Sequence, residues 1–261
     1  MSRSAHFRGI SAGLTLVVCA VGTWQLATVA LGADRLPGLP ATLGAFVQSA
    51  FSEPIIEAQG GGPGGYWPHA MVTLRNTLVG VLGGAALGVL ASLLAVQWRP
   101  VLAVYDSIVE IVRVLPPLIL IPFAILLSDS ADRIELAVVA LYSALSMSLY
   151  TIGACAALPP EYSQMAALLG AGRLRNAFSV QMRAILPSLI GPLRVNAALG
   201  TGICVVCEFL AVPKGIGRVM KFALSFYRVD LILVGVLWAI LCVLVVEGLV
   251  SLFCRPFRRW L

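Results

Sequence analysis

The chain has 261 residues, of which 59% are hydrophobic and only 11% are charged, with a net charge of +6 and a mean hydropathy of +0.95. Soluble domains carry about 25% charged residues, so this composition excludes an ordinary soluble fold. The basic residues flank apolar segments singly or in small groups, and they form no basic stripe with interleaved aromatic residues. We therefore predict a protein of the lipid bilayer and no nucleic acid partner.

Six apolar segments are long enough to cross a membrane, which takes about 20 apolar residues in a helix. They cover residues 10–31, 71–98, 101–128, 134–158, 185–212 and 231–253. The prediction is an all-α polytopic membrane helical bundle with about six transmembrane helices, forming a single domain over residues 1–261. The first segment exceeds the roughly 7–15 residues of a signal-peptide core, which favours a retained anchor. The distribution of Lys and Arg in the flanks favours cytoplasmic N- and C-termini.

The outer loop, residues 32–68, is predicted to hold one helix. Thr42 is suited to cap this helix, and apolar residues recur at helical spacing from Leu43 to Phe51. Residues 60–65 contain five glycines and one proline. Because glycine has the greatest conformational freedom, this run is expected to be a flexible tether.

The second apolar segment carries small residues at strict four-residue spacing, namely Gly80, Gly84, Gly88 and Ser92. Residues four apart lie on one face of a helix, and small side chains there let another helix approach closely. The favoured interpretation is packing within the same chain. A seam between two copies of the chain is the alternative.

Charged residues inside apolar segments are costly, so each is a functional candidate. Glu110 and Arg113 are three residues apart and can pair across one turn, just before the helix-breaking Pro116 and Pro117. Either this pair satisfies itself, or Arg113 faces a water-filled path and attracts an anion. Further members of this candidate path set are Arg194 and Glu208.

Several enzyme constellations are absent from the sequence. No phosphate-binding glycine loop followed by Lys and Ser or Thr is present, so the chain is not expected to hydrolyse ATP. Its two histidines, His6 and His69, are far apart. Cys204 and Cys207 have the spacing of a redox or zinc motif, but they lie within an apolar segment without a second pair. We expect inert packing thiols there, with no metal site and no catalytic residue.

The loop at residues 159–187 has the features of an ordered helical element. Pro159 and Pro160 end the preceding segment, and Glu161 suits the positive end of a new helix. Gly170-Ala171-Gly172 then turns the chain into a second, basic helix that begins at Arg173, and Pro187 marks entry into the next segment. Two short helices around a glycine turn can dock into a partner as one rigid body. A helix lying on the lipid headgroups is the alternative.

This loop resembles the coupling signature of permease subunits of binding-protein-dependent ABC importers, which reads Glu-Ala-Ala, three residues, Gly, and a later Leu-Pro. The residues assigned to the coupling loop on this basis are Gln164, Met165, Ala166, Ala167, Gly170, Ala171, Arg173 and Pro187. The resemblance extends along nearly the whole chain and is most specific to the nitrate, taurine and alkanesulfonate branch. Further matching elements are Leu36-Pro37, Thr73-Leu74-Arg75, Arg113-Val114-Leu115-Pro116-Pro117, Leu186-Pro187 and Gly215-Ile216-Gly217.

The sequence departs from the family pattern in three places. Gln164 and Met165 replace the leading acid and the following alanine, Arg183 stands where a first proline is common, and residues 127–130 differ from the usual Phe-Gly-Ile-Gly. These departures suggest the divergent half of a heterodimeric permease, with a partner chain that keeps the standard motif.

The resemblance implies a type I ABC importer-like permease in the bacterial inner membrane that forms the path of a small anionic solute. It implies three protein partners: an ABC ATPase subunit, a second permease copy in a homodimer or heterodimer, and a periplasmic or surface-anchored solute-binding protein. ATP and Mg²⁺ would then be bound by the partner ATPase, with no cofactor on this chain. A secondary carrier or channel, or a membrane scaffold protein, is the alternative function.

Overall fold

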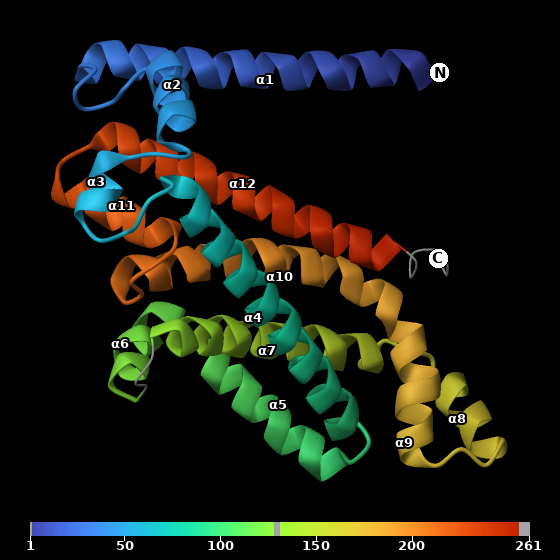
Figure 1. The fold of residues 1–261 in the computed structure, drawn as a ribbon. Helices are drawn as coiled ribbons and strands as arrows, with labels where there is room; N and C mark the ends of the chain where they lie inside the picture. The colour runs from blue at the N-terminus through green and yellow to red at the C-terminus, as the bar shows by residue number, and fades with distance from the viewer. Residues whose placement is uncertain (1, 128–130, 256–261) are drawn as a thin grey trace. The chain divides into compact units, whose positions relative to one another are not determined.

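The computed structural model describes residues 2–127 and 131–255, which contain helices and no strand (Figure 1). The helices are α1 (Ser2–Leu31), α2 (Leu39–Ser49), α3 (Pro54–Ala58), α4 (Tyr66–Ala95), α5 (Arg99–Arg113), α6 (Pro117–Leu127), α7 (Ala131–Ala156), α8 (Pro160–Leu168), α9 (Arg173–Asn176), the π-helix η1 (Ala177–Gln181), α10 (Met182–Leu210), α11 (Ile216–Ser225) and α12 (Val229–Cys254). They form two compact units, one of Met1–Trp67 with Val219–Leu237 and one of Pro68–Arg218 with Trp238–Leu261.

The predicted all-α membrane bundle is confirmed. Within the described residues, four helices are long and apolar enough to cross a membrane, or five if the bent pair α5–α6 counts as one span. The six predicted segments differ from this count at two places. On α1, the apolar helix found within the described residues is the shorter stretch Val18–Leu31. The predicted span over residues 101–128 is not one straight helix, because α5 and α6 meet at an angle of 93°.

The bend between α5 and α6 has a local cause. α5 ends at Arg113, and α6 begins at Pro117 after a break that contains Pro116. A proline cannot donate a backbone hydrogen bond, and its ring disfavours helical geometry in the residue before it. Two consecutive prolines therefore end one helix and start another in a new direction.

The larger unit has its core where α4, α7, α10 and the C-terminal part of α12 meet. A buried cluster draws on all four helices, with Val81, Val139, Ala197 and Val246 among its members. Further buried clusters join α4, α7 and α10 at one level and α6, α7 and α10 at another. The bundle is thus built around α10, which contributes to every one of these clusters.

The glycine face of α4 packs against α7 of the same chain. A Cβ atom at Gly84 would overlap the Ala140 carbonyl oxygen, and one at Gly88 would overlap that of Ala144. A Cβ atom at Gly80 would lie 2.7 Å from Val139 Cγ1. These contacts correspond to the favoured interpretation of the stripe, because only glycine allows the two backbones this close.

The smaller unit includes α2, α3 and the start of α12. The predicted outer-loop helix is present as α2, but Thr42 does not cap it. The N-cap is Gly38, and the Thr42 hydroxyl donates a hydrogen bond to its carbonyl from within the helix. Pro40 supplies the start signal, because proline fits the first turn of a helix.

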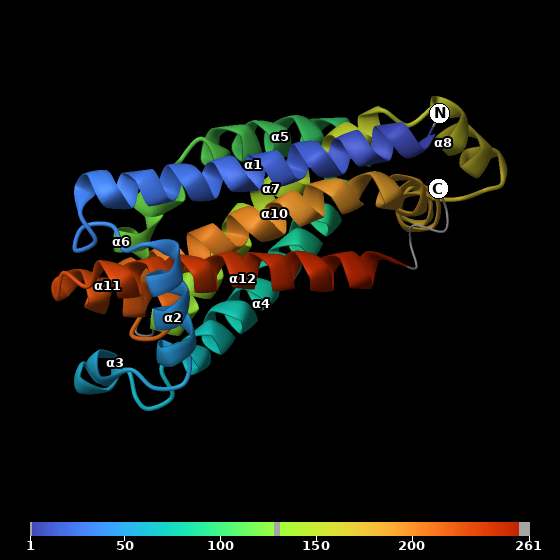
Figure 2. The same cartoon turned by 90° about the horizontal axis from the view of Figure 1, so that it is seen from above.

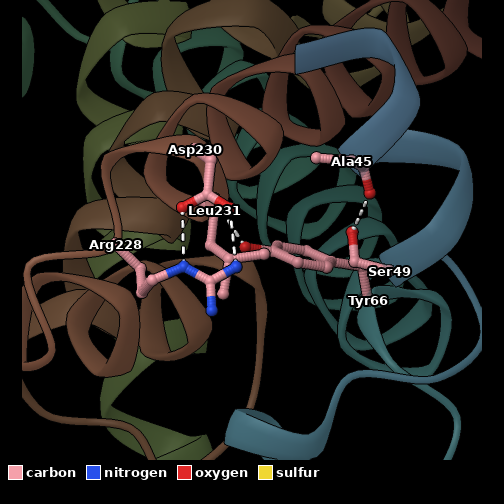
Figure 3. A network of polar contacts seen from close by, with 6 residues as sticks. All are labelled: Ala45, Ser49, Tyr66, Arg228, Asp230 and Leu231. Carbon is pink, nitrogen blue, oxygen red and sulfur yellow. Dashed lines mark hydrogen bonds and ion pairs between the residues drawn. The ribbon is translucent and has the colours of Figure 1, made fainter. Parts of the chain in front are cut away.

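A polar network fixes the start of α12 in this unit (Figure 3). The Tyr66 hydroxyl, fully buried, donates to the Leu231 carbonyl at 2.6 Å. Arg228 donates two hydrogen bonds to the Asp230 carboxylate, at 2.8 and 2.6 Å. This bidentate partner raises the pKa of the Arg228 guanidinium above its ordinary value.

Candidate functional site

The predicted coupling loop is a helical hairpin at one end of α10 (Figures 1 and 2). α8 begins at Pro160 with Glu161 in its first turn and ends at Leu168. Gly170 follows with φ of +73°. Its N–H bonds the Ala167 carbonyl, and the Ala171 N–H bonds the Ala166 carbonyl, each at 2.9 Å. This pair of bonds is a Schellman motif, which explains why a glycine stands at residue 170.

The second half of the hairpin continues directly into the bundle. α9, η1 and α10 follow one another without a break, so one helical run extends over Arg173–Leu210. Pro187, expected to mark the entry into the next membrane segment, lies inside α10 rather than at the start of a helix. A π-helical turn is often found at functional positions in helices, and here it occupies the junction between loop and bundle.

Side-chain amides connect the hairpin to the end of α4. Gln97 donates to the Gln181 Oε1 at 2.8 Å. Gln181 and Asn176 both donate to the Ser163 hydroxyl of α8, at 3.5 and 3.3 Å. The hairpin is thus attached to two helices of the bundle, and its position depends on both.

The exposed surface of the hairpin is unusually apolar. Met165, Leu168 and Leu169 expose 63%, 87% and 84% of their side chains, while Ala166 is buried beneath them. The remaining predicted residues of this loop on the surface are Gln164, Ala167, Gly170 and Arg173. Apolar side chains this exposed at the tip of a hairpin are typical of a surface that binds a protein or a membrane.

A cavity of about 380 Å³ lies between α5, α6, α7 and α10 in the larger unit. Its wall is mainly aliphatic, and Arg113 is the cationic residue among its lining residues. The lining residues with hydroxyl or amide groups are Tyr142, Ser146, Tyr150 and Asn196. The Asn196 Nδ2 donates to Ser143 at 2.7 Å, whereas its buried Oδ1 has no hydrogen-bond partner within the described residues.

The structure separates the four residues predicted for a solute path. Arg113 lines the cavity, but Glu110, Arg194 and Glu208 do not. The Glu110–Arg113 ion pair, one of the two alternatives, is not formed; within the described residues the ion pair is Arg228–Asp230. Arg194 is half-buried on α10, and its enclosed Nε has no hydrogen-bond partner in the part of the chain that the structure describes. Arg113 is the last residue of α5, directly before the bend.

Glu208 lies instead in a buried polar cluster of α4, α7, α10 and the loop that follows α10. Its carboxylate accepts hydrogen bonds from the Thr73 hydroxyl at 2.6 Å and the Gly217 N–H at 3.0 Å. Thr73 also accepts from the Ile216 N–H at 3.1 Å. Gly215, with φ of +104°, packs against the carboxylate so closely that a Cβ atom would overlap it. The Gly-Ile-Gly motif therefore wraps around this acid.

A second buried acid, Glu135, was missed by the sequence analysis. It accepts from the Asn76 Nδ2 at 3.0 Å and from the Cys204 thiol, and its side chain is fully buried. It stands two residues after Arg133 at the start of an apolar segment, so it resembled a boundary residue. A signal was present on α4, where Thr73, Asn76 and Thr77 extend the small-residue face toward the N-terminus.

Comparison with known families and structures agrees with this architecture. Residues 84–259 match the family of binding-protein-dependent transport system inner membrane components. The chain belongs to this family. It is therefore a membrane-spanning permease component of the binding-protein-dependent ABC importer type, which is a transport subunit and not itself an enzyme.

The individual relatives share less than 30% of their residues with this chain. The taurine transport system permease protein TauC of Escherichia coli is 24% identical over 76% of this chain and 72% of the relative. The nitrate import permease protein NrtB of Synechococcus elongatus is 23% identical over 78% and 74%, and the riboflavin transport system permease protein RibX of Chloroflexus aurantiacus is 28% identical over 74% and 72%. A chain of the inward-facing MetNI methionine ABC transporter superposes with a TM-score of 0.58 and 16% identity, covering 71% of this chain and 94% of that chain.

Proposed function

We propose that the α8–α9 hairpin docks a separate ATPase subunit, which binds ATP and Mg²⁺ and drives the conformational change of the permease. The observation that carries this proposal is the exposed apolar tip of Met165, Leu168 and Leu169 on a hairpin without a flexible joint to α10. A partner that binds these side chains would gain roughly 25 cal/mol per Å² of apolar surface removed from water. Its movement would pass directly into the helical run Arg173–Leu210.

Co-purification with the ATPase tests the docking role. Leu168→Asp should remove the tagged permease–ATPase complex, because the partner would bury an unpaired charge. Leu168→Met keeps an apolar side chain of similar volume and should retain the complex. Retention of the ATPase by Leu168→Asp at the level of Leu168→Met would contradict the docking proposal.

For the solute, we infer a small anion that passes the cavity beside Arg113. One permanent cation and several hydroxyl and amide groups in an aliphatic wall suit a sulfonate, a carboxylate or nitrate. The names of two relatives, for taurine and nitrate, point the same way, whereas the riboflavin relative does not. The choice of an anion therefore rests on Arg113.

The remaining partners are proposed by analogy with the family. A solute-binding protein would deliver the solute to the face opposite the α8–α9 hairpin, with both chain termini in the cytoplasm. A second permease copy, identical or homologous, would complete the path. The exposed apolar residues Val47, Phe51 and Tyr227 of the smaller unit are candidates for contact with the solute-binding protein.

Uptake of radiolabelled taurine and nitrate into proteoliposomes, with the ATPase and the solute-binding protein, tests the solute path. Arg113→Gln should lower ATP-dependent uptake about tenfold or more, since a hydrogen bond to a charged group contributes about 1.5–3 kcal/mol. The matched variant Glu110→Gln removes a nearby charge that lies outside the cavity and should keep most of the uptake. Equal losses in the two variants would contradict the role of Arg113, and uptake without ATP would indicate a secondary carrier.

A further inference from the structure

Three potential metal ligands converge inside the larger unit, away from the cavity beside Arg113. The thiol of Cys204 and one carboxylate oxygen each of Glu135 and Glu208 lie within 4.8 Å of one another. All three side chains are fully buried. They come from α7 and α10, and α4 covers them with Thr73, Asn76 and Thr77. Chain segments 69 residues apart thus bring their donor atoms to one point.

The orientation of the two carboxylates is that of ligands held by outer hydrogen bonds. Cys204 faces the Oε1 atom of both acids. The Oε2 atoms point outward and are fixed by other donors, Asn76 Nδ2 on Glu135 and the Gly217 N–H on Glu208. Metal-binding carboxylates are commonly oriented by such a second layer of hydrogen bonds.

A fourth possible donor atom is the hydroxyl oxygen of Thr77. Thr77 is fully buried one turn after Thr73, and its hydroxyl lies beside the Cys204 thiol. Within the described residues this hydroxyl makes no hydrogen bond of ordinary geometry. Buried hydroxyl groups are almost always hydrogen-bonded, so an unsatisfied one beside the Cys204 thiol suggests that a ligand is missing there.

The buried carboxylate of Glu208 also favours a cation at this position. Glu208 receives hydrogen bonds and makes no ion pair within the described residues. A buried carboxylate at close range to a second acid and a thiol is costly unless positive charge compensates it. A divalent ion would compensate the two carboxylates, and binding would release the thiol proton to solvent.

From this geometry we propose that Glu135, Cys204 and Glu208 bind a zinc-like divalent metal ion, with the Thr77 hydroxyl as the fourth donor. Mixed thiolate and carboxylate ligands in fourfold coordination suit Zn²⁺ and Cd²⁺ better than Mg²⁺ or Ca²⁺, which take oxygen ligands alone. The ion would tie α4, α7 and α10 together as a structural element. A metal-binding Cys204 differs from the inert packing thiol expected from the sequence, in which Glu135 is 69 residues away.

Metal retention by the purified permease complex tests the site. After zinc supplementation and dialysis, we expect one zinc ion per permease chain by mass spectrometry. Cd²⁺ should displace it and give a thiolate charge-transfer band in the ultraviolet. Cys204→Ser and Glu135→Gln should each weaken Cd²⁺ binding at least tenfold. Cys207→Ser is the matched control, because Cys207 is equally buried one turn away and faces apolar neighbours including Ile121 and Val138.

A second variant and a second readout keep the test independent of folding defects. Thr77→Val removes the fourth donor alone and should weaken Cd²⁺ binding several-fold in an intact complex. Zinc should also raise the thermal unfolding midpoint of the wild type and of Cys207→Ser, but not of Cys204→Ser. The proposal is overturned if the wild type retains no stoichiometric zinc or cadmium, as expected if the two carboxyl groups share a proton instead. Equal binding by Cys204→Ser and Cys207→Ser would overturn it as well.

Discussion

Two neighbouring glycines of α4 offer a direct measurement of the contact between α4 and α7. Gly84 is buried, and a Cβ atom there would overlap the backbone carbonyl of Ala140. Gly83 is exposed, and a Cβ atom there would meet nothing within 4 Å. Both changes to alanine bring the same gain in helix propensity, about 1 kcal/mol. The difference between Gly83→Ala and Gly84→Ala therefore isolates the steric cost of separating the two helices.

That cost should be about 1–3 kcal/mol, the usual range for an added methyl group in a well-packed core. The obstacle to the new methyl group is backbone, so no side-chain rotation relieves it and α7 must move as a whole. Equilibrium unfolding in mixed micelles should show Gly83→Ala as neutral or slightly stabilised and Gly84→Ala as less stable than Gly83→Ala by that amount. Stabilities within about 0.5 kcal/mol of each other would refute the reasoning. A loss of dimer without a change in unfolding would instead place the glycine face at a seam between copies.

Two further predictions use matched pairs in the same way. Gly170→Ala would force alanine into the left-handed conformation that Gly170 adopts, at a cost of about 1–2 kcal/mol, and should reduce ATP-dependent uptake. Gly172 has an ordinary φ, so Gly172→Ala should be tolerated in the same uptake assay. Thr73→Val removes a hydrogen-bond donor to Glu208 and should lower the free energy of unfolding by about 1–3 kcal/mol. Thr77→Val in chelator-treated protein should change the free energy of unfolding little. Equal effects of the two variants in denaturant titrations would contradict the assigned hydrogen bonds.

The parts of the fold that were predicted from the sequence are those with local signals. Pro160 begins α8 and Gly170 follows its end, and both were predicted because proline and glycine act through their own backbone geometry. The start of α2 was misassigned to Thr42 although Pro40 carried the stronger signal. Pro116 and Pro117 indicated a break, but the new direction of α6 depends on packing against α7 and α10 and cannot be read from two residues.

The buried polar cluster could not be predicted for a different reason. Glu135 and Cys204 are 69 residues apart, and neither residue identifies its partner. Glu208 was singled out as a membrane-buried acid, but a role in a solute path and a role in the core were equally compatible with its position in the sequence. The spatial arrangement of α4, α7 and α10 distinguishes these roles, because it places Glu208 against Thr73 and outside the cavity wall.

The buried cluster also imposes an order on biogenesis. Glu135 enters the bilayer on α7 when Asn76 of α4 is already available, but Cys204 is made 69 residues later. At about 5–20 residues per second, Glu135 of a nascent chain is in the membrane without the Cys204 thiol for roughly 3–14 s. Cys204 reaches Glu135 once α10 is inserted, and Gly217 then donates its hydrogen bond to Glu208. In a chain truncated before Gly217, the carboxylate of Glu208 would lack the Gly217 hydrogen bond within the membrane. A membrane protease or chaperone could recognise such a carboxylate as a sign of incomplete synthesis.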